Sequence, residues 1–196
     1  MSLAPGIRSC LYDRAELESL LDAMALRAAR LLHGRRRVAV IGILRRGAPL
    51  ADRLTERLVR DHGLERPLRL DLRVKRYADD LTLLHPETEL TEPDRDAALD
   101  LNGWTVLLVD DVLYTGHSLL KVVEHLARQQ PAEIRVAVLA DRVAATLPIA
   151  ADVVGARLQI APAGIIECQV PPYEDDFRIE LLQPQRVLAS PWLGAD

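Results

Sequence analysis

The sequence predicts an α/β fold in which a mostly parallel β-sheet is flanked by helices. Residues 38–44, 105–109 and 134–140 are runs dominated by apolar and β-branched side chains, typical of strands buried on both faces. Between these runs, apolar residues recur at the three- and four-residue spacing of helices. Strands that alternate with helices predict a parallel sheet, and ligands bind such sheets beyond the carboxyl ends of the strands.

The first half of the chain carries clear signals for where its helices begin and end. A helix is expected to open at Asp13, because Asp13 and Glu16 have the spacing of a capping box, and to end near Gly34. After the first strand, a second helix is expected with Pro49 in its first turn and Gly63 at its end.

A long polar stretch separates the second strand from the third. The second strand is expected at residues 68–74, and the stretch runs from Lys75 to about Gly103. A connection of that length inside a compact domain is usually a lid or a binding loop. After the strand at residues 105–109, a helix is expected from Ser118. Shorter strands are expected at residues 153–154, 165–170 and 177–182.

Length and composition indicate an ordinary globular protein. The 196 residues are enough for one substantial core, so a single domain over residues 1–196 is expected. No run supplies the roughly 18 to 20 apolar residues that cross a bilayer, and the start lacks the pattern of an export signal. These observations predict a cytoplasmic protein that does not span a membrane.

Charge and cysteine content exclude further classes. The net charge of −4 argues against wholesale, charge-driven binding of nucleic acid. The three arginines at residues 35–37 could bind anions, but such runs are usually solvated surface. Cys10 and Cys168 lie far apart without a neighbouring cysteine or histidine pattern, so both are interpreted as structural thiols.

The most informative segment is the strand that ends at Asp110 and Asp111 and continues into a loop of hydroxyls and glycine. Adjacent carboxylates can accept hydrogen bonds from vicinal sugar hydroxyls and can meet magnesium directly or through its waters. The hydroxyls of Thr115 and Ser118 and the amides of a helix start suit a phosphate, which Gly116 lets approach closely. Together these residues predict a site for ribose 5-phosphate.

Three other classes of α/β protein do not fit this sequence. Nucleoside triphosphatases need a Gly-x-x-x-x-Gly-Lys loop, but neither Lys75 nor Lys121 follows a glycine. Dinucleotide-binding folds need Gly-x-Gly, which is absent from the sequence. Phosphorylation receiver domains need a lysine well downstream of their aspartates, and no lysine follows Lys121.

The run Asp-Asp-Val-Leu-Tyr-Thr-Gly at residues 110–116 resembles the phosphoribosyl-pyrophosphate signature of type I phosphoribosyltransferases, most closely the form found in the PyrR family. Residues 43–53 are similar to that family's first loop and helix, residues 79–81 to its mobile loop, and residues 141–152 to its stretch near the base. The resemblance implies a type I phosphoribosyltransferase fold with a lid at about residues 75–103 and a small hood at about residues 141–185. It also implies magnesium, phosphoribosyl pyrophosphate and a nucleobase as ligands, and a homo-oligomer.

The resemblance assigns roles to individual residues. Arg45, Arg46 and Gly47 would form a pyrophosphate loop, and Lys75, Arg76 and Tyr77 would meet the departing pyrophosphate from the root of the lid. The candidate catalytic residues are Asp110, Asp111, Arg46 and Arg76, with Asp110 and Asp111 also the candidate metal ligands. The candidate substrate-binding residues are Val112, Leu113, Tyr114, Thr115, Gly116, His117, Ser118, Arg45, Gly47, Lys75, Tyr77, Asp141 and Arg142.

Two departures from the family pattern leave the exact activity open. Ala78 stands where the family's Tyr-Arg-Asp-Asp pattern has arginine, and residues 143–145 read Val-Ala-Ala in place of Gly-His-Arg. The second change removes basic character from a face that binds RNA in PyrR proteins, which argues against an RNA-binding role. The resulting hypothesis is a transferase for a nucleobase, with uracil expected. The alternatives are a transferase for a purine base and a regulatory protein that senses phosphoribosyl pyrophosphate without transferring it.

Overall fold

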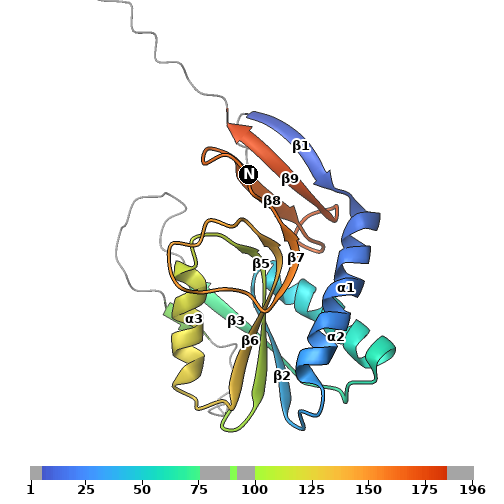
Figure 1. Ribbon diagram of the computed structural model, residues 1–196, viewed down its shortest axis with the longest axis vertical. Helices are drawn as coiled ribbons and strands as arrows, with labels where there is room; N and C mark the ends of the chain where they lie inside the picture. The colour runs from blue at the N-terminus through green and yellow to red at the C-terminus, as the bar shows by residue number, and fades with distance from the viewer. Residues whose placement is uncertain (1–5, 76–88, 92–99, 185–196) are drawn as a thin grey trace, which may run out of the picture.

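The computed structural model describes residues 6–75, 89–91 and 100–184. A six-stranded sheet has the order β4-β3-β2-β5-β6-β7, in which β4 is antiparallel to β3 and every other neighbouring pair is parallel (Figure 1). Its strands are β2 (Val38–Leu44), β3 (Leu68–Lys75), β4 (Glu89–Thr91), β5 (Thr105–Leu113), β6 (Glu133–Asp141) and β7 (Val153–Arg157). The predicted α/β class with a mostly parallel sheet is confirmed.

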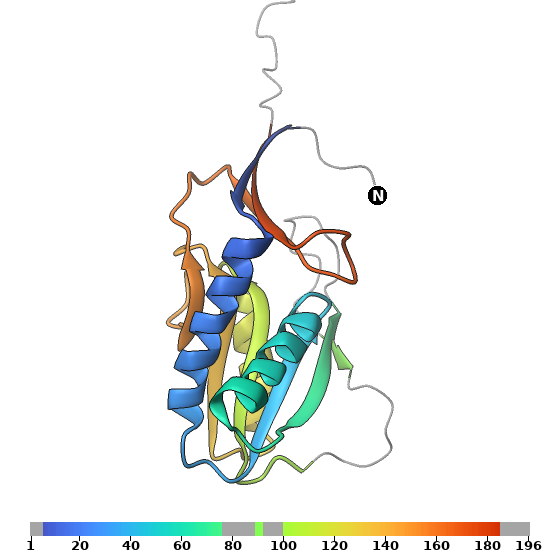
Figure 2. The same cartoon turned by 90° about the vertical axis from the view of Figure 1, so that its right-hand side faces the viewer.

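Helices cover both faces of this sheet. Helices α1 (Arg14–Leu32) and α2 (Gly47–His62) pack side by side on one face, and α3 (His117–Ala127) packs on the other (Figures 1 and 2). The predicted capping box at the start of α1 is present, because Asp13 accepts from the Glu16 amide at 2.9 Å and Glu16 accepts from the Asp13 amide at 2.8 Å. Helix α2 ends at Gly63, whose φ of +64° is the left-handed conformation that glycine adopts without steric cost.

Alternate residues of the central strands enter two separate cores. Val40 and Leu107 belong to the cluster that includes the apolar faces of α1 and α2. Their neighbours Ile41 and Leu108 belong to the cluster that includes α3. Because side chains alternate across a strand, two covered faces require apolar residues at every position. This is why the strand sequences are continuous apolar runs and do not alternate with polar residues.

A second sheet of three antiparallel strands, in the order β1-β9-β8, lies above the carboxyl ends of the large sheet (Figure 1). Its strands are β1 (Gly6–Tyr12), β8 (Ile165–Gln169) and β9 (Arg178–Pro184). The sequence did not predict β1, because its residues are exposed or half-buried and show no regular alternation. The strand forms because it pairs with β9, which comes from the other end of the chain.

Several boundaries differ from the prediction, and those near the predicted site matter most. Strand β5 continues past residue 109 to Leu113, so both aspartates lie within the strand and not beyond it. Helix α3 begins at His117 and α2 at Gly47, so the predicted loops are shorter than expected. The stretch expected to be a lid contains β4, while Arg76, Tyr77, Ala78 and residues 79–81 lie outside the described residues. Among the helices described, none combines the length and apolar character required to cross a membrane.

Candidate functional site

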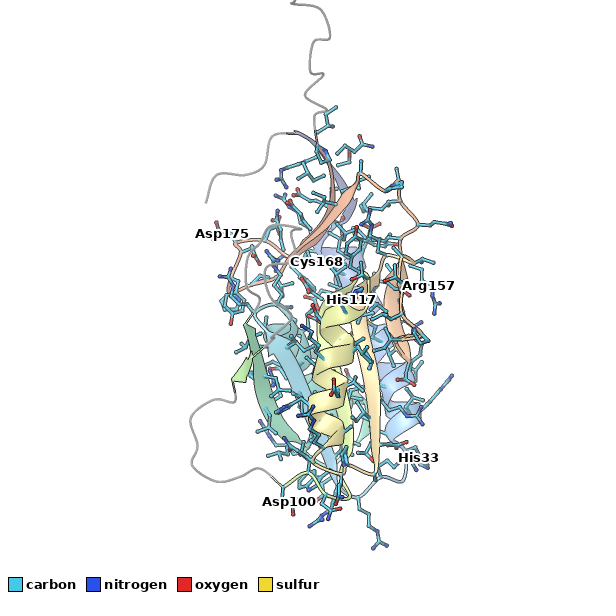
Figure 3. The ribbon with its side chains drawn as sticks, turned by 90° about the vertical axis from the view of Figure 1, so that its left-hand side faces the viewer. His33, Asp100, His117, Arg157, Cys168 and Asp175 are labelled. Atoms are coloured by element: carbon cyan, nitrogen blue, oxygen red, sulfur yellow. The ribbon has the colours of Figure 1, made fainter. Side chains whose placement is uncertain are left out.

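The site predicted from the sequence lies at the carboxyl ends of β2, β5 and β6. These strands are neighbours and run parallel, so the loops that follow them meet at one edge of the sheet, beneath the three-stranded sheet. In Figure 3, His117 and Cys168 are labelled in this upper part of the molecule, whereas His33 and Asp100 mark its lower end.

Asp110 and Asp111 lie near the end of β5, and both carboxylates are held by the backbone. Asp110 is 8% exposed, and one of its oxygens accepts from the Asp111 amide at 2.9 Å. Asp111 in turn accepts from the Val112 amide at 2.9 Å. These local hydrogen bonds orient both carboxylates at the edge of the sheet where the site is predicted.

A polar pocket of about 130 Å³ follows the aspartates. Gly116 lies at the N-cap of α3 with a φ of +88°, and a Cβ atom there would approach the Ile149 side chain to 2.5 Å. His117 Nδ1 lies 3.0 Å from the Thr115 hydroxyl. No side chain caps the N-terminus of α3 in the part of the chain that the structure describes. The residues that line the pocket are Asp110, Val112, Leu113, Tyr114, Thr115, Gly116, Ser118, Leu119 and Val138.

The second helix start at this edge carries the predicted pyrophosphate loop. The Leu44–Arg45 peptide is cis, and α2 begins at Gly47 without a side-chain cap among the described residues. A Cβ atom on Gly47 would lie 2.5 Å from the Val109 carbonyl oxygen and 3.2 Å from Asp110 Cα. Glycine is therefore required for α2 to approach the end of β5 this closely.

Arg46 links this loop to Asp111 and to the hood. Its guanidinium donates to Glu174 at 2.6 and 3.1 Å and lies 3.8 Å from Asp111. The hydrogen bonds to Glu174 raise the pKa of Arg46 above its ordinary value. Burial works to raise the pKa of Glu174, but the bonds from Arg46 and the Val170 amide outweigh it, and the pKa is lowered. An anion that binds Arg46 must therefore compete with a carboxylate already in place.

Glu174 and Tyr173 were not predicted from the sequence. The Arg45 guanidinium lies 5.3 Å from the centre of the Tyr173 ring, so two consecutive arginines meet two consecutive hood residues. The available signal was the polar, acidic segment after Pro171 and Pro172, because such a segment between two strands is a loop near the sheet's edge. Nothing in the sequence pairs it with Arg45 and Arg46.

Cys168 is a buried thiol close to this group of charges. Its burial, together with the nearby charge of Asp111, raises the pKa of the thiol well above its ordinary value. A thiol in that state is a poor nucleophile, in keeping with the structural role that the sequence predicts.

Asp141 and Arg142 follow one another at the end of β6, beside the pocket. The Arg142 side chain is buried: its guanidinium lies 4.3 Å from the centre of the Tyr114 ring and donates to the carbonyls of Ala161 and Pro162 at 3.2 and 2.9 Å. Asp141 accepts from the Val143 amide at 2.8 Å. The structure thus brings Arg142 to the predicted site as a support for Tyr114, which is 41% exposed.

Of the lid residues of the predicted site, only Lys75 belongs to the part of the chain that the structure describes. The backbone of Lys75 ends β3, but its side chain lies outside the described residues, as do Arg76 and Tyr77.

Val143 adopts a conformation suited to glycine. Its φ is +57°, in the left-handed region that β-branched residues rarely enter, and the family pattern described above has glycine at this position.

We expect Val143→Gly to raise the free energy of unfolding by about 1 kcal/mol in urea titrations, since the relief of strain exceeds glycine's entropic cost. Ile165→Gly, which truncates another exposed β-branched residue without a positive φ, should lower stability. A loss of stability in Val143→Gly would contradict the strain.

The aspartate pair fits magnesium as a partial ligand set. No group of three or more His, Cys, Asp or Glu side chains that could hold a metal is found within the described residues. Magnesium is usually bound through one or two carboxylates together with substrate phosphates and water. Asp110 and Asp111 match that arrangement if a diphosphate supplies further oxygens.

Comparisons with known proteins agree with this geometry. A family model described as "Phosphoribosyl transferase domain" matches residues 11–174. The "Bifunctional protein PyrR" of Clostridium perfringens is 35% identical over 175 residues, which cover 84% of this chain and 97% of that protein. The protein of the same name from Caldicellulosiruptor bescii is 34% identical over 183 residues, covering 87% and 98%.

Solved structures share the fold at low identity. A crystal structure of the hypoxanthine phosphoribosyltransferase of Trypanosoma cruzi matches with a TM-score of 0.71 and 19% identity over 90% of this chain and 97% of that one. The Staphylococcus aureus hypoxanthine phosphoribosyltransferase matches with a TM-score of 0.70 and 17% identity over 90% and 93%. Because a matching family model spans most of the sequence and PyrR relatives align along nearly their whole length, this chain belongs to the phosphoribosyltransferase family and is PyrR-like within it.

Proposed function

We propose that this protein transfers the phosphoribosyl group of phosphoribosyl pyrophosphate to a nucleobase, uracil, releasing pyrophosphate. The observation that carries the proposal is the pair of uncapped helix starts, α2 and α3, on either side of Asp110 and Asp111 at one sheet edge, as the structure describes them. Helix N-termini favour anions, and carboxylates favour hydroxyl donors. This arrangement suits a ligand with a diol in its middle and a phosphate group at each end.

Each end of the ligand would have its own binding groups. The 5-phosphate would lie in the pocket at Thr115 and Gly116, against the first amides of α3. The diphosphate would lie at Arg46 and Gly47, where it would replace Glu174 as the partner of the guanidinium. Asp110 and Asp111 would accept hydrogen bonds from the ribose hydroxyls and hold the sugar in place.

Catalysis would rest on positioning and charge. Asp110 and Asp111 would hold magnesium, which when bound would supply positive charge to the leaving diphosphate. The fixed carboxylates would lie near the positive charge that develops on the sugar as the bond to pyrophosphate breaks, so they would stabilise it electrostatically. A nucleobase nitrogen would attack the anomeric carbon, with Tyr114 and Arg142 supporting the base side of the pocket. Arg76, Lys75 and Tyr77 complete the proposal as lid residues.

A regulatory protein that binds phosphoribosyl pyrophosphate without transferring it is the second candidate. Ala78 and the Val-Ala-Ala sequence at residues 143–145 favour it, because both changes remove basic groups from the lid and base regions. A transferase for a purine base is the third candidate. Residues 143–145 follow Arg142 in the stretch near the base, and their departure from the family pattern could change which base is accepted. A cytoplasmic homo-oligomer made of single-domain chains remains part of the proposal.

Base-dependent pyrophosphate release separates these candidates. The protein would be incubated with phosphoribosyl pyrophosphate, magnesium and one of uracil, hypoxanthine, xanthine, guanine, adenine or orotate, beside controls without base and with a chelator. We expect release with uracil that the chelator abolishes. Pyrophosphate release only with a purine would favour the third candidate, a transferase for a purine base. Calorimetric binding without release for any base would establish the second.

A further inference from the structure

A second pocket, of about 180 Å³, lies at the opposite end of the large sheet, where its strands begin. It combines several arginines with an aromatic ring and an apolar floor. The lower end of the molecule in Figure 3, where His33 is labelled, carries the turn that leads into the arginine run at residues 35–37. The pocket is lined by Arg35, Arg36, Arg37, Val38, Leu64, Glu65, Arg66, Pro67, Leu68 and Trp104.

Three segments distant in the sequence build this pocket. The parallel registers place Ala39 beside Leu68 and Val38 beside Thr105, so the residues before β2, β3 and β5 meet. The Arg37 carbonyl accepts from the Thr105 amide at 2.8 Å, and the Leu64 amide donates to the Leu58 carbonyl at 3.0 Å. The walls of the pocket are therefore fixed by backbone hydrogen bonds.

The arginines around the pocket are mostly uncompensated. Arg35 is paired with Glu133 at 2.5 Å. Arg36, Arg37 and Arg66 make no ion pair with any residue that the structure describes, and Glu65 is the one carboxylate in the lining. Arg36, Arg37 and Arg66 are exposed and line one pocket, so an anion bound there would accept charge-assisted hydrogen bonds from guanidinium groups that have no carboxylate partner among the described residues.

The remaining lining is apolar and aromatic. Val38 and Pro67 are buried, and the Trp104 ring is half-buried with the Arg37 guanidinium 5.5 Å from its centre. An inorganic anion would gain nothing from contact with these apolar and aromatic side chains. A ligand with an anionic group and a flat ring uses both parts, because guanidinium binds phosphate and indole stacks on planar rings.

We propose that the pocket formed by Arg36, Arg37, Arg66 and Trp104 binds a nucleoside phosphate, with the phosphate among the arginines and the base against the indole. The seven residues of β2 separate it from the predicted transferase site, a distance on the order of 20 Å. The two sites do not overlap, so this proposal stands whether or not the protein is a transferase.

Trp104 supplies a local measurement. The sequence has two tryptophans, so a Trp192→Phe background leaves Trp104 as the one indole reporter. This protein would be titrated with UMP, GMP and UTP, and in separate arms with uridine, inorganic phosphate and pyrophosphate, following indole fluorescence. We expect saturable quenching by at least one nucleotide, and much weaker responses to uridine and to the inorganic anions.

Two charge-matched variants test the residues. Arg36→Gln with Arg66→Gln should weaken the nucleotide response by at least about tenfold. Arg60→Gln with Arg128→Gln, which removes two exposed arginines paired with Asp61 and Glu124 elsewhere on the surface, should leave it unchanged.

Four results would overturn the proposal. The first three are that no nucleotide quenches Trp104, that both double variants behave alike, or that pyrophosphate alone binds as tightly as the nucleotide. The fourth is a short single-stranded RNA that binds far more tightly through the same arginines, which would assign the pocket to a nucleic-acid groove.

Discussion

Asp110→Asn combined with Asp111→Asn is expected to lower kcat/KM for phosphoribosyl transfer by about 10²- to 10⁴-fold. Each substitution removes a charged acceptor for a ribose hydroxyl, and a hydrogen bond to a charged group contributes about 1.5 to 3 kcal/mol. The fold should persist, because asparagine retains the side-chain oxygen that accepts from the next backbone amide in both positions. Steady-state rates of pyrophosphate release, with circular dichroism as the check on folding, measure both effects.

A matched pair of distant aspartates provides the control. Asp22→Asn with Asp61→Asn removes the same total charge from exposed positions on α1 and α2, where the partners are Arg57 and Arg60. This variant should keep wild-type turnover. Undiminished turnover in the Asp110 and Asp111 double variant would contradict the proposal that these carboxylates bind the ribose hydroxyls.

Gly47→Ala is expected to have the second largest effect. A Cβ atom at residue 47 would meet the Val109 carbonyl oxygen at 2.5 Å, and this neighbour is backbone that cannot rotate away. The start of α2 must therefore move away from the end of β5, at a cost of about 1 to 3 kcal/mol in stability. Because Arg46 moves with it, kcat/KM should fall by about 10²-fold, the penalty for displacing a binding group by about 1 Å.

Gly63→Ala separates loss of stability from displacement of the site. Gly63 closes the same helix at its other end with a φ of +64°, and nothing lies within 4 Å of where its Cβ would be. Alanine there should cost about 1 kcal/mol through backbone strain and leave the kinetics of the folded protein intact. Equal kinetic losses in the two variants, measured well below their unfolding midpoints, would show that Gly47 has no special role.

The ion pair between Arg46 and Glu174 affects how a diphosphate would bind at the predicted site. Both groups are charged and are joined by hydrogen bonds of 2.6 and 3.1 Å, so a diphosphate gains less from Arg46 than from an unpaired guanidinium. Release of Glu174 would also free the hood residues around it. Binding of the diphosphate and movement of the hood are therefore expected to be coupled.

Much of the fold follows from local patterns in the sequence. The bounds of β2 and the start and end of α1 match the prediction, because the capping box and a continuous apolar run determine them locally. The paired aspartates and Gly116 could be predicted as one group, since they are consecutive in the chain and follow a buried strand. The family was recognisable for the same reason. The lid residues from Arg76 onward, by contrast, stay a prediction.

Local patterns were thus enough for the α/β class, the main strands and helices and the segment at residues 110–118, all of which depend on spacing within a few turns of chain. Other features became visible only in three dimensions: β1 pairs with β9, Glu174 holds Arg46, and Arg142 lies buried against Tyr114. The arginine run at residues 35–37 is exposed, as expected, but only the fold shows that it lines a pocket with Arg66 and Trp104. Each of these contacts joins segments that are far apart in the sequence. The order and pairing of the strands bring such segments together, and strand order and pairing leave no periodic signal in the sequence.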